Sequence, residues 1–363
     1  MPLHPLVGHS QARRRLAAAT RSDRLPQVLL VTGPAGVGKQ QLALWLAQLV
    51  LCELKETEPC DRCRSCRLVL RLSHADLHWF VPIPRPKAAD PDKQVDEAAE
   101  ALAEIMDERR ARGLWAAPDG MASHSMASVR LLQRRASLTS VEGGARVFVI
   151  GDADRLISQE ANPEAANALL KLLEEPPAGA LFVLTALDPR QVLPTIRSRA
   201  VPLRLGRLAD ADVRSFLEEH LRPAPSGPAL EGRVARARGA IGEALAEGDE
   251  AGGAYRAARE LLDAVLAGPG PALERALRQP AFAARGEFAA MLDALSDTLG
   301  EAARGTLGQP VRRTVPEALL RHRTPAPLLR AMERVAGARE AAWGNVNPQL
   351  LLAVLGEELA EVL

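Results

Sequence analysis

The sequence predicts a three-layer α/β domain followed by helical regions. Four apolar runs have the length and composition of buried parallel strands, and they lie at residues 27–32, 77–81, 147–150 and 181–185. The first run leads into a glycine-rich segment and then into a helix with apolar residues from Leu42 onward. Past about Arg207, helical patterns dominate. Strands that alternate with helices indicate a parallel sheet covered by helices.

Length and composition limit the class of protein. The chain has 363 residues, 47% of them hydrophobic, which suggests two or three domains with ordinary cores. No apolar run approaches the ~18 residues of a membrane span, and the first residues lack a signal-peptide pattern. We therefore expect a cytoplasmic protein without membrane contact. The net charge is only +1 and aromatic residues make up 3%, so any nucleic-acid contact would come from a local patch.

The segment after the first strand is a phosphate-binding loop that departs from its pattern at the last position. It satisfies G-x-x-x-x-G-K, and Gln40 then stands where Ser or Thr should be. In an intact loop, backbone amides cradle the phosphates, the lysine meets the terminal phosphates and the hydroxyl holds Mg²⁺. An amide oxygen is a longer and poorer magnesium ligand. The candidate nucleotide-binding residues are Gly33, Gly36, Gly38, Lys39 and Gln40.

All four cysteines fall in one short segment. Cys52, Cys60, Cys63 and Cys66 follow the spacing C-x7-C-x2-C-x2-C. Thiolates two residues apart on a tight turn can face one ion, and four of them complete a closed tetrahedral zinc site. Disulfides suit a cytosolic chain badly, and iron–sulfur clusters use other spacings. We expect structural Zn²⁺, because four thiolates leave no open position for catalysis.

Residues from about 85 to 126 interrupt the alternation of strands and helices. A proline-rich start is followed by a charge-rich stretch with one helical pattern around Val95 to Arg110. We interpret this segment as a surface insertion, a solvated helix without chemistry of its own.

The end of the third strand also departs from the pattern of a working ATPase. Such a strand ends with an acidic residue that orders magnesium, and here Gly151 holds that position with Asp152 after it. Together with Gln40, both protein positions that organise magnesium are altered. Two changes at one ion predict lost hydrolysis, while binding of ATP or ADP through Lys39 stays open.

Two further motifs precede the helical regions. Residues 167–177 read N-A-L-L-K-L-L-E-E-P-P, a helix with one apolar face that the prolines end. Glu174 and Glu175 oppose the macrodipole of this helix, which indicates either a solvated face or a contact elsewhere. Downstream, Arg197 and Arg199 come just after the expected last strand of the sheet. Taken alone, Arg199 would be an ordinary surface arginine or one paired with a nearby acid.

These motifs together resemble the clamp-loader subunits of the AAA+ ATPases. The resemblance rests on the phosphate-binding loop, the four cysteines after its helix, the 167–177 motif and the Ser198-Arg199-Ala200 triplet. By motif it covers about residues 5–82 and 128–250.

The resemblance implies three domains. Residues 1–206 would form the AAA+ α/β domain, with the zinc module at 52–66 and the insertion at about 85–126. A helical lid would follow over 207–267, and a helical collar for oligomerisation over 268–363.

The departures from the family pattern favour a subunit without ATPase activity over the ATPase subunits of the gamma/tau kind. Besides Gln40 and Gly151, Gly242 stands where the family has a C-terminal sensor arginine. Yet the arginine of the family's Ser-Arg-Cys motif is kept as Arg199, with Ala200 in place of the cysteine. An arginine finger supplied in trans accelerates phosphoryl transfer by orders of magnitude.

The resemblance therefore implies a stator that gives Arg199 to a neighbour during ATP-driven loading of a sliding clamp onto primed DNA. Its implied partners are gamma/tau and delta subunits in a hetero-pentamer, the sliding clamp and primer–template DNA. Two alternatives stay open. One is an active gamma/tau-like ATPase that uses Gln40 and Asp152 in unusual ways, and the other is a nucleotide-gated interaction module outside replication.

Overall fold

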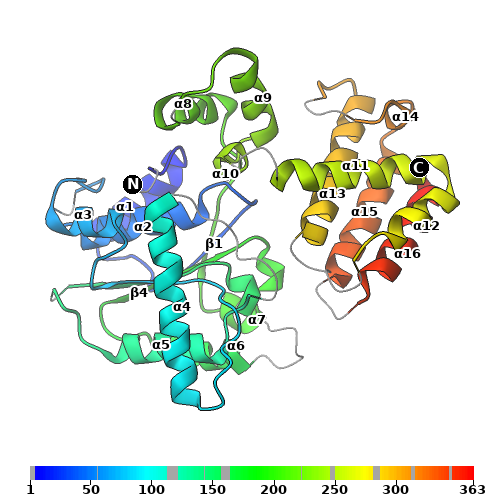
Figure 1. The fold of residues 1–363 in the computed structure, drawn as a ribbon. Coiled ribbons are helices and arrows are strands. Elements are labelled where there is room, and N and C mark those ends of the chain that lie inside the picture. The colour runs from blue at the N-terminus through cyan, green and yellow to red at the C-terminus, as the bar shows by residue number, and fades with distance from the viewer. Residues whose placement is uncertain are drawn as a thin grey trace. The chain divides into compact units, whose positions relative to one another are not determined.

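The described part of the chain falls into two compact units, each with its own hydrophobic core (Figure 1). The first unit comprises Met1–Leu230 and Ala237–Gly242, and the second comprises Glu231–Arg236 and Glu243–Leu363. Among the described residues, no helix has both the length and the apolar character to cross a membrane. The computed structural model describes residues 5–54, 56–112, 122–142, 144–156, 164–221, 223–245, 250–280, 287–311, 315–342 and 346–363.

The first unit is built on a five-stranded parallel sheet with the strand order β2-β3-β4-β1-β5. The central strands β1, β3 and β4 are buried throughout, as their continuous apolar runs predict. Because parallel strands end at the same edge of a sheet, the loops after these three strands meet there. The strands are β1 (Val28–Thr32), β2 (Leu77–Phe80), β3 (Arg146–Ile150), β4 (Ala180–Ala186) and β5 (Val201–Arg204).

The fifth strand corrects the sequence analysis, which ended the sheet at β4. β5 pairs with β1, and Pro202 lies opposite Leu30. Three of its four residues are exposed and Leu203 is half-buried, so the strand carries no buried apolar run. A proline is tolerated there because β5 borders a single strand among those described. Arg199 therefore lies between β4 and β5, not beyond the sheet.

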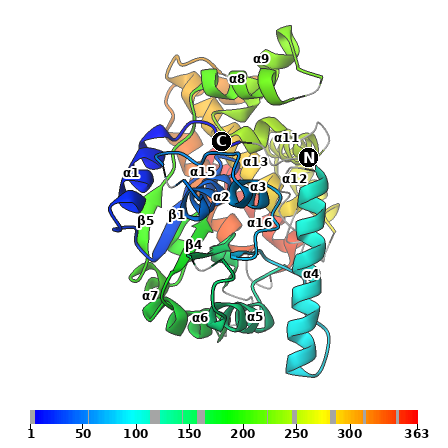
Figure 2. The ribbon, with the colours of Figure 1, turned by 90° about the vertical axis from the view of Figure 1, so that its left-hand side faces the viewer.

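Helices cover both faces of this sheet, so the predicted three layers are confirmed (Figures 1 and 2). α1 (Ser10–Arg21), α2 (Lys39–Leu51) and α3 (Arg64–Leu70) lie on one side, with α2 in contact with the three central strands. The other side carries α5 (Met126–Ser137), α6 (Glu164–Glu174) and α7 (Pro194–Arg197). Two short 3₁₀ turns, η1 (Ala153–Leu156) and η2 (Pro189–Gln191), follow β3 and β4.

The inserted segment forms the predicted helix, and the structure corrects one point, because one stripe of this helix is packed and not solvated. α4 (Pro91–Arg112) runs along the end of the sheet opposite β5 (Figure 2). Val95, Ala98 and Leu102 are at most 2% exposed and belong to the core of the first unit. Their stripe is only one residue wide per turn, which is why the charged composition concealed it. Residues 113–121 of the predicted insertion lie outside the described residues.

The second unit is helical. Its core joins α11 (Glu250–Ala267), α12 (Pro269–Leu277), α13 (Glu287–Thr306), α15 (Ala326–Ala341) and α16 (Pro348–Val362), with the short α14 (Glu317–Leu320) beside α13. α11 falls within the predicted lid range, yet its buried Leu261 and Leu262 pack with the helices that follow it. The helices α8 (Asp210–His220), α9 (Gly227–Ala237) and α10 (Ile241–Leu245) precede it in the chain. The boundaries of lid and collar stay predictions.

Candidate functional site

The phosphate-binding loop keeps its backbone shape. Gly38 precedes α2 with a φ of 97°, a left-handed conformation that favours glycine. A Cβ on Gly33 would lie 2.5 Å from the carbonyl oxygen of Leu205, so no larger residue fits there. The loop thus connects β1 to α2 as the sequence predicts. The departures from the ATPase pattern lie at Gln40, at the start of α2, and at positions outside the loop.

Lys39 is turned onto the loop itself. Its Nζ donates hydrogen bonds to the carbonyl oxygens of Gly33 and Pro34 at 2.9 and 2.8 Å. Burial lowers the pKa of Lys39 to about 8, against the opposing charges of Asp152 and Asp154. The ammonium group that would meet terminal phosphates therefore already has protein acceptors.

Gln40 and Gly151, the two departures from the magnesium-binding pattern, lie against each other. The Gln40 Nε2 lies 3.4 Å from both carboxylate oxygens of Asp152 and donates to them. A Cβ on Gly151 would lie 2.8 Å from that Nε2 and 3.0 Å from Cδ of the same side chain. An acidic residue at 151 and this conformation of Gln40 therefore exclude each other. The two departures from the ATPase pattern form one linked change.

Arg109 of α4 belongs to the same cluster, and the sequence analysis missed it. The residue is only 3% exposed, and its guanidinium lies over Trp79 with Cζ 3.7 Å from the ring centroid. Burial raises the pKa of Asp152, and the charges of Arg155, Lys39 and Arg109 oppose that rise. One signal was available: position 109 continues the stripe of Val95, Ala98 and Leu102 at helical spacing.

Gly242, which follows β5 in the chain, packs directly against the loop. The Gly242 amide donates to the carbonyl oxygen of Gly36 at 2.9 Å, and a Cβ on Gly242 would lie 2.7 Å from the Gly36 Cα. An arginine at 242, as the family pattern has it, would not fit this arrangement. At Gly8, the Leu208 Cδ2 lies 2.4 Å from where a Cβ would be. Gly242 thus contacts the loop directly at Gly36, whereas Gly8 contacts Leu208.

The four cysteines converge as predicted. Their Sγ atoms all lie within 4.8 Å of one another, and Cys52 and Cys66 are buried. The Cys63 amide donates to the Cys60 Sγ at 3.3 Å, and this bond is the main reason that the pKa of Cys60 falls to about 7. Four thiolates at this separation suit a tetrahedral metal ion, and the donor set is the one that zinc prefers.

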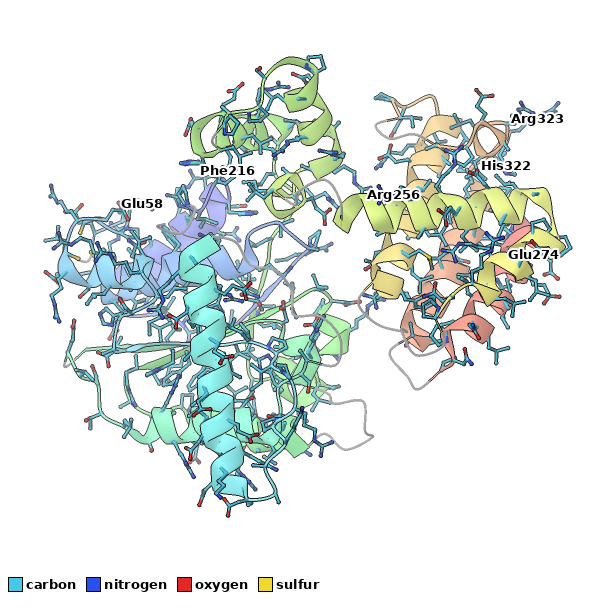
Figure 3. All side chains as sticks on the ribbon, viewed as in Figure 1. Glu58, Phe216, Arg256, Glu274, His322 and Arg323 are labelled. Atoms are coloured by element: carbon cyan, nitrogen blue, oxygen red, sulfur yellow. The ribbon has the colours of Figure 1, made fainter. Side chains whose placement is uncertain are left out.

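Side chains tie this cysteine module (residues 52–66) to the rest of the first unit. Glu58, labelled in Figure 3, accepts hydrogen bonds from Arg13 Nη2 at 2.7 Å and Trp45 Nε1 at 2.9 Å. These contacts join the loop between the first two cysteines to α1 and α2. The module is therefore anchored to the helices that flank the phosphate-binding loop.

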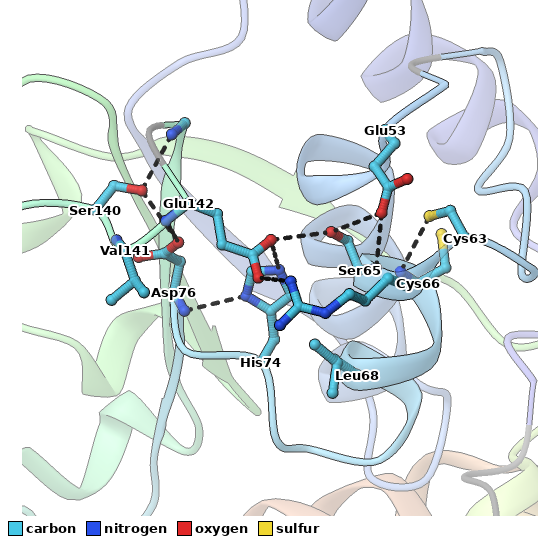
Figure 4. A network of polar contacts seen from close by, with 12 residues as sticks. Glu53, Cys63, Ser65, Cys66, Leu68, His74, Asp76, Ser140, Val141 and Glu142 are labelled. Atoms are coloured by element: carbon cyan, nitrogen blue, oxygen red, sulfur yellow. Dashed lines mark hydrogen bonds and ion pairs between the residues drawn. The ribbon is translucent and has the colours of Figure 1, made fainter.

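A second network joins the module to the sheet (Figure 4). Glu142 accepts from the Ser65 hydroxyl on α3 at 3.3 Å and lies 3.4 Å from the His74 Nε2. The Asp76 carboxylate accepts from the amides of Val141 and Glu142 at 2.9 and 3.1 Å. His74 is buried between the loop around Glu142 and the start of β2, where its Nδ1 accepts from the Asp76 amide at 3.1 Å.

Arg199, the candidate finger, forms an ion pair with Glu174 at the end of α6. Its Nη1 donates to the Thr195 carbonyl oxygen at 2.9 Å and to the Ser198 hydroxyl at 3.2 Å. The Arg199 side chain is 34% exposed. Arg199 is thus paired with a nearby acid, and Glu174 is both exposed and in contact with a residue outside its helix.

Comparisons with known proteins decide the family. Residues 8–209, more than half of the chain, match the model of the family described as DNA polymerase III, delta subunit. The chain belongs to this family. The resemblance inferred from the motifs is thereby confirmed, and this clamp-loader protein can be set beside its relatives.

Two of these relatives are named DNA polymerase III subunit delta′. The Bacillus subtilis protein is 30% identical over 181 residues, which are 50% of this chain and 42% of that protein. The Pseudomonas aeruginosa protein is 30% identical over 173 residues, 47% of this chain and 40% of that protein. The matched region of the clamp-loader chain thus spans about two fifths of the length of these relatives.

A solved structure resembles the clamp-loader chain weakly. A gamma subunit-related protein from Thermotoga maritima gives a TM-score of 0.35 at 14% identity, covering 95% of this chain and 98% of that one. The family assignment therefore rests on the sequence match.

Proposed function

We propose that this clamp-loader subunit is a delta-prime-like stator that has no ATPase activity of its own. The observation that carries the proposal is the Gln40 side chain, which occupies the space beside Gly151 where a magnesium-ordering carboxylate would lie. The Lys39 ammonium group donates two hydrogen bonds to carbonyl oxygens of the loop. Gly242 leaves no room for a sensor arginine. Such a site lacks both the hydroxyl at position 40 and the carboxylate at position 151 with which these enzymes organise Mg²⁺ for phosphoryl transfer. An active gamma/tau-like enzyme is disfavoured for the same reason.

The stator would act on a neighbouring subunit through Arg199. Its guanidinium lies at the surface, fixed by the backbone and hydroxyl of the α7 turn, outside the core of the first unit. A guanidinium held in this way can stabilise charge that develops on a phosphate supplied by another chain. The partners would be gamma/tau and delta subunits in a hetero-pentamer, with the sliding clamp and primer–template DNA as the substrates of ATP-driven loading in the cytoplasm.

The metal that suits the cysteine cluster is a structural Zn²⁺. Cys52, Cys60, Cys63 and Cys66 would hold it, and the four thiolates leave no ligand position for a substrate. Its role would be to fix the module against α2 and the loop around Glu142. The stator role does not require ATP or ADP to bind at this chain's own phosphate-binding loop.

The test is a reconstituted clamp loader with the matching gamma/tau and delta subunits. Arg199→Ala should lower clamp- and DNA-stimulated ATP turnover by about tenfold or more while assembly stays intact. Arg197→Ala is the matched control, because Arg197 is an exposed arginine of the same turn. Equal turnover by the Arg199→Ala complex and the unmodified complex would overturn the proposal.

A further inference from the structure

Arg199 already has an acidic partner within its own chain. Glu174 is the last residue of α6, and its Oε1 pairs with Nη2 of the arginine. The Nη1 hydrogens are used by the Thr195 carbonyl and the Ser198 hydroxyl. The Nη2 edge that Glu174 occupies is therefore the edge through which the guanidinium would reach a ligand outside the chain.

We propose that Glu174 is a positioning residue that holds Arg199 as a counter-ion and is exchanged for phosphate oxygens when a neighbouring subunit binds ATP. This inference rests on the proposed function of Arg199. Carboxylate and phosphate oxygens are alternative acceptors for the same guanidinium edge. While Glu174 holds the arginine, its charge also cancels the attraction that Arg199 exerts on the neighbour's nucleotide.

The surroundings of the pair suit an exchange rather than a permanent bond. The side chains are 34% and 44% exposed for Arg199 and Glu174, so water screens their attraction. An exposed pair of this kind shifts an equilibrium by about two- to fivefold. A triphosphate carries several negative charges and can displace a single carboxylate held this weakly.

The position of Glu174 in its helix supports a contact role. A carboxylate in the last turn of a helix is unfavourable next to the negative end of the macrodipole, unless a cation compensates it. Arg199 supplies that cation across 25 residues of sequence. The next residue, Glu175, is exposed, and among the described residues it has no ion pair, which makes it a matched control.

The test compares Glu174→Gln, Glu175→Gln, Arg199→Ala and the double variant Glu174→Gln/Arg199→Ala in the reconstituted clamp loader. The glutamine keeps the size and an acceptor oxygen but removes the charge. Glu174→Gln should lower the KM for ATP by about two- to fivefold in the absence of clamp and DNA. Glu175→Gln should leave the KM unchanged, and the double variant should behave as Arg199→Ala alone.

The outcomes separate this inference from the proposed function. If Arg199→Ala slows turnover but Glu174→Gln leaves the KM unchanged or raises it, the exchange is wrong and the finger stands. The exchange is equally wrong if Glu174→Gln changes the KM by the same factor in the Arg199→Ala background. If Arg199→Ala leaves turnover unchanged, the finger itself fails. Thermal unfolding of each variant confirms that a change in KM does not reflect misfolding.

Discussion

The side chain of Gln40 lies where a side chain on Gly151 would have to be. Its Nε2 is 2.8 Å from the position of a Cβ on residue 151, and it donates to the Asp152 carboxylate that follows. In a working ATPase these two positions give magnesium a hydroxyl and a carboxylate. The two ligands have therefore been replaced as a pair by a contact within the protein.

The coupling between the two residues is measurable as stability. Gly151→Ala should lower the free energy of unfolding by about 0.5–1.5 kcal/mol, because the new methyl group forces the Gln40 amide out of its present rotamer. The same change in a Gln40→Ala background should cost under about 0.5 kcal/mol, since the space is then free. Urea unfolding of the four proteins gives the interaction energy.

Gly206→Ala is the control for this cycle, because no atom lies within 4 Å of a Cβ at Gly206. It should change the free energy of unfolding equally in both backgrounds. Additive costs for Gln40→Ala and Gly151→Ala would mean that the two positions are not linked.

Arg109 should matter for the stability of the first unit although it comes from a charge-rich helix. Arg109→Ala removes the contact with the Trp79 ring and a cation close to the buried Asp152, so we expect a loss of about 2–4 kcal/mol. The neighbouring Arg110 pairs with Asp107 at the surface, and Arg110→Ala should cost under about 0.5 kcal/mol. Thermal or urea unfolding compares the two, and similar losses would contradict the placement of Arg109.

Metal removal should loosen the cysteine module and the network that joins it to the sheet. We expect one zinc ion per chain by elemental analysis. A chelator that binds zinc more tightly than the four cysteines should expose the amides of α3 and residues 140–142 to hydrogen exchange. The reason is that Ser65 beside Cys66 holds Glu142, so the cysteine cluster and this loop move together.

Adding Zn²⁺ back should restore the protection of these amides. The amides of β1 and β4, in the centre of the sheet, should stay protected throughout and serve as the internal control. Unchanged exchange of α3 after complete removal of the metal would contradict a structural role.

Acid should destabilise the first unit through buried histidines. Burial lowers the pKa of His124 to about 4 from its ordinary value of 6.5, and its Nε2 lies 2.7 Å from the Gly151 carbonyl oxygen. Burial also lowers the pKa of His78 to about 4. Protonation favours the unfolded chain, whose histidines titrate near 6.5. The stability that the neutral histidines contribute is thus complete above about pH 6.5 and is lost as the pH falls toward 4.

The slope of this loss gives the test. Each histidine should add about 1.4 kcal/mol per pH unit between these limits. His124→Gln keeps an N–H donor for Gly151 but cannot take up a proton, so it should remove one histidine's share of the slope. An unchanged slope between pH 6.5 and 4 would show that folding does not lower the pKa of His124.

The sequence was sufficient where a pattern is local. The four apolar runs, the glycine-rich loop and the cysteine cluster each need only a few neighbouring residues to be recognised, and all of them were found. β5 was missed because an edge strand with Pro202 and mostly exposed side chains carries no apolar run. The packing of α4 was missed because one buried residue per turn leaves the composition polar.

Contacts between distant segments could not be predicted in the same way. The pairs Gln40 with Gly151 and Glu174 with Arg199 exist only because the sheet brings the ends of β1 and β3, and of α6 and α7, together. The sequence marked each of these residues as unusual but could not show which partner it meets.

The most direct test of the account compares Lys39→Ala with Arg199→Ala in the reconstituted loader, by ATP turnover with clamp and primed DNA. Lys39 is buried and hydrogen-bonded to the carbonyl oxygens of Gly33 and Pro34, whereas Arg199 lies at the surface. The account predicts that Arg199→Ala slows turnover and that Lys39→Ala leaves it unchanged. Slow turnover with Lys39→Ala and normal turnover with Arg199→Ala would show that this chain hydrolyses ATP at its own phosphate-binding loop, and would contradict the stator role.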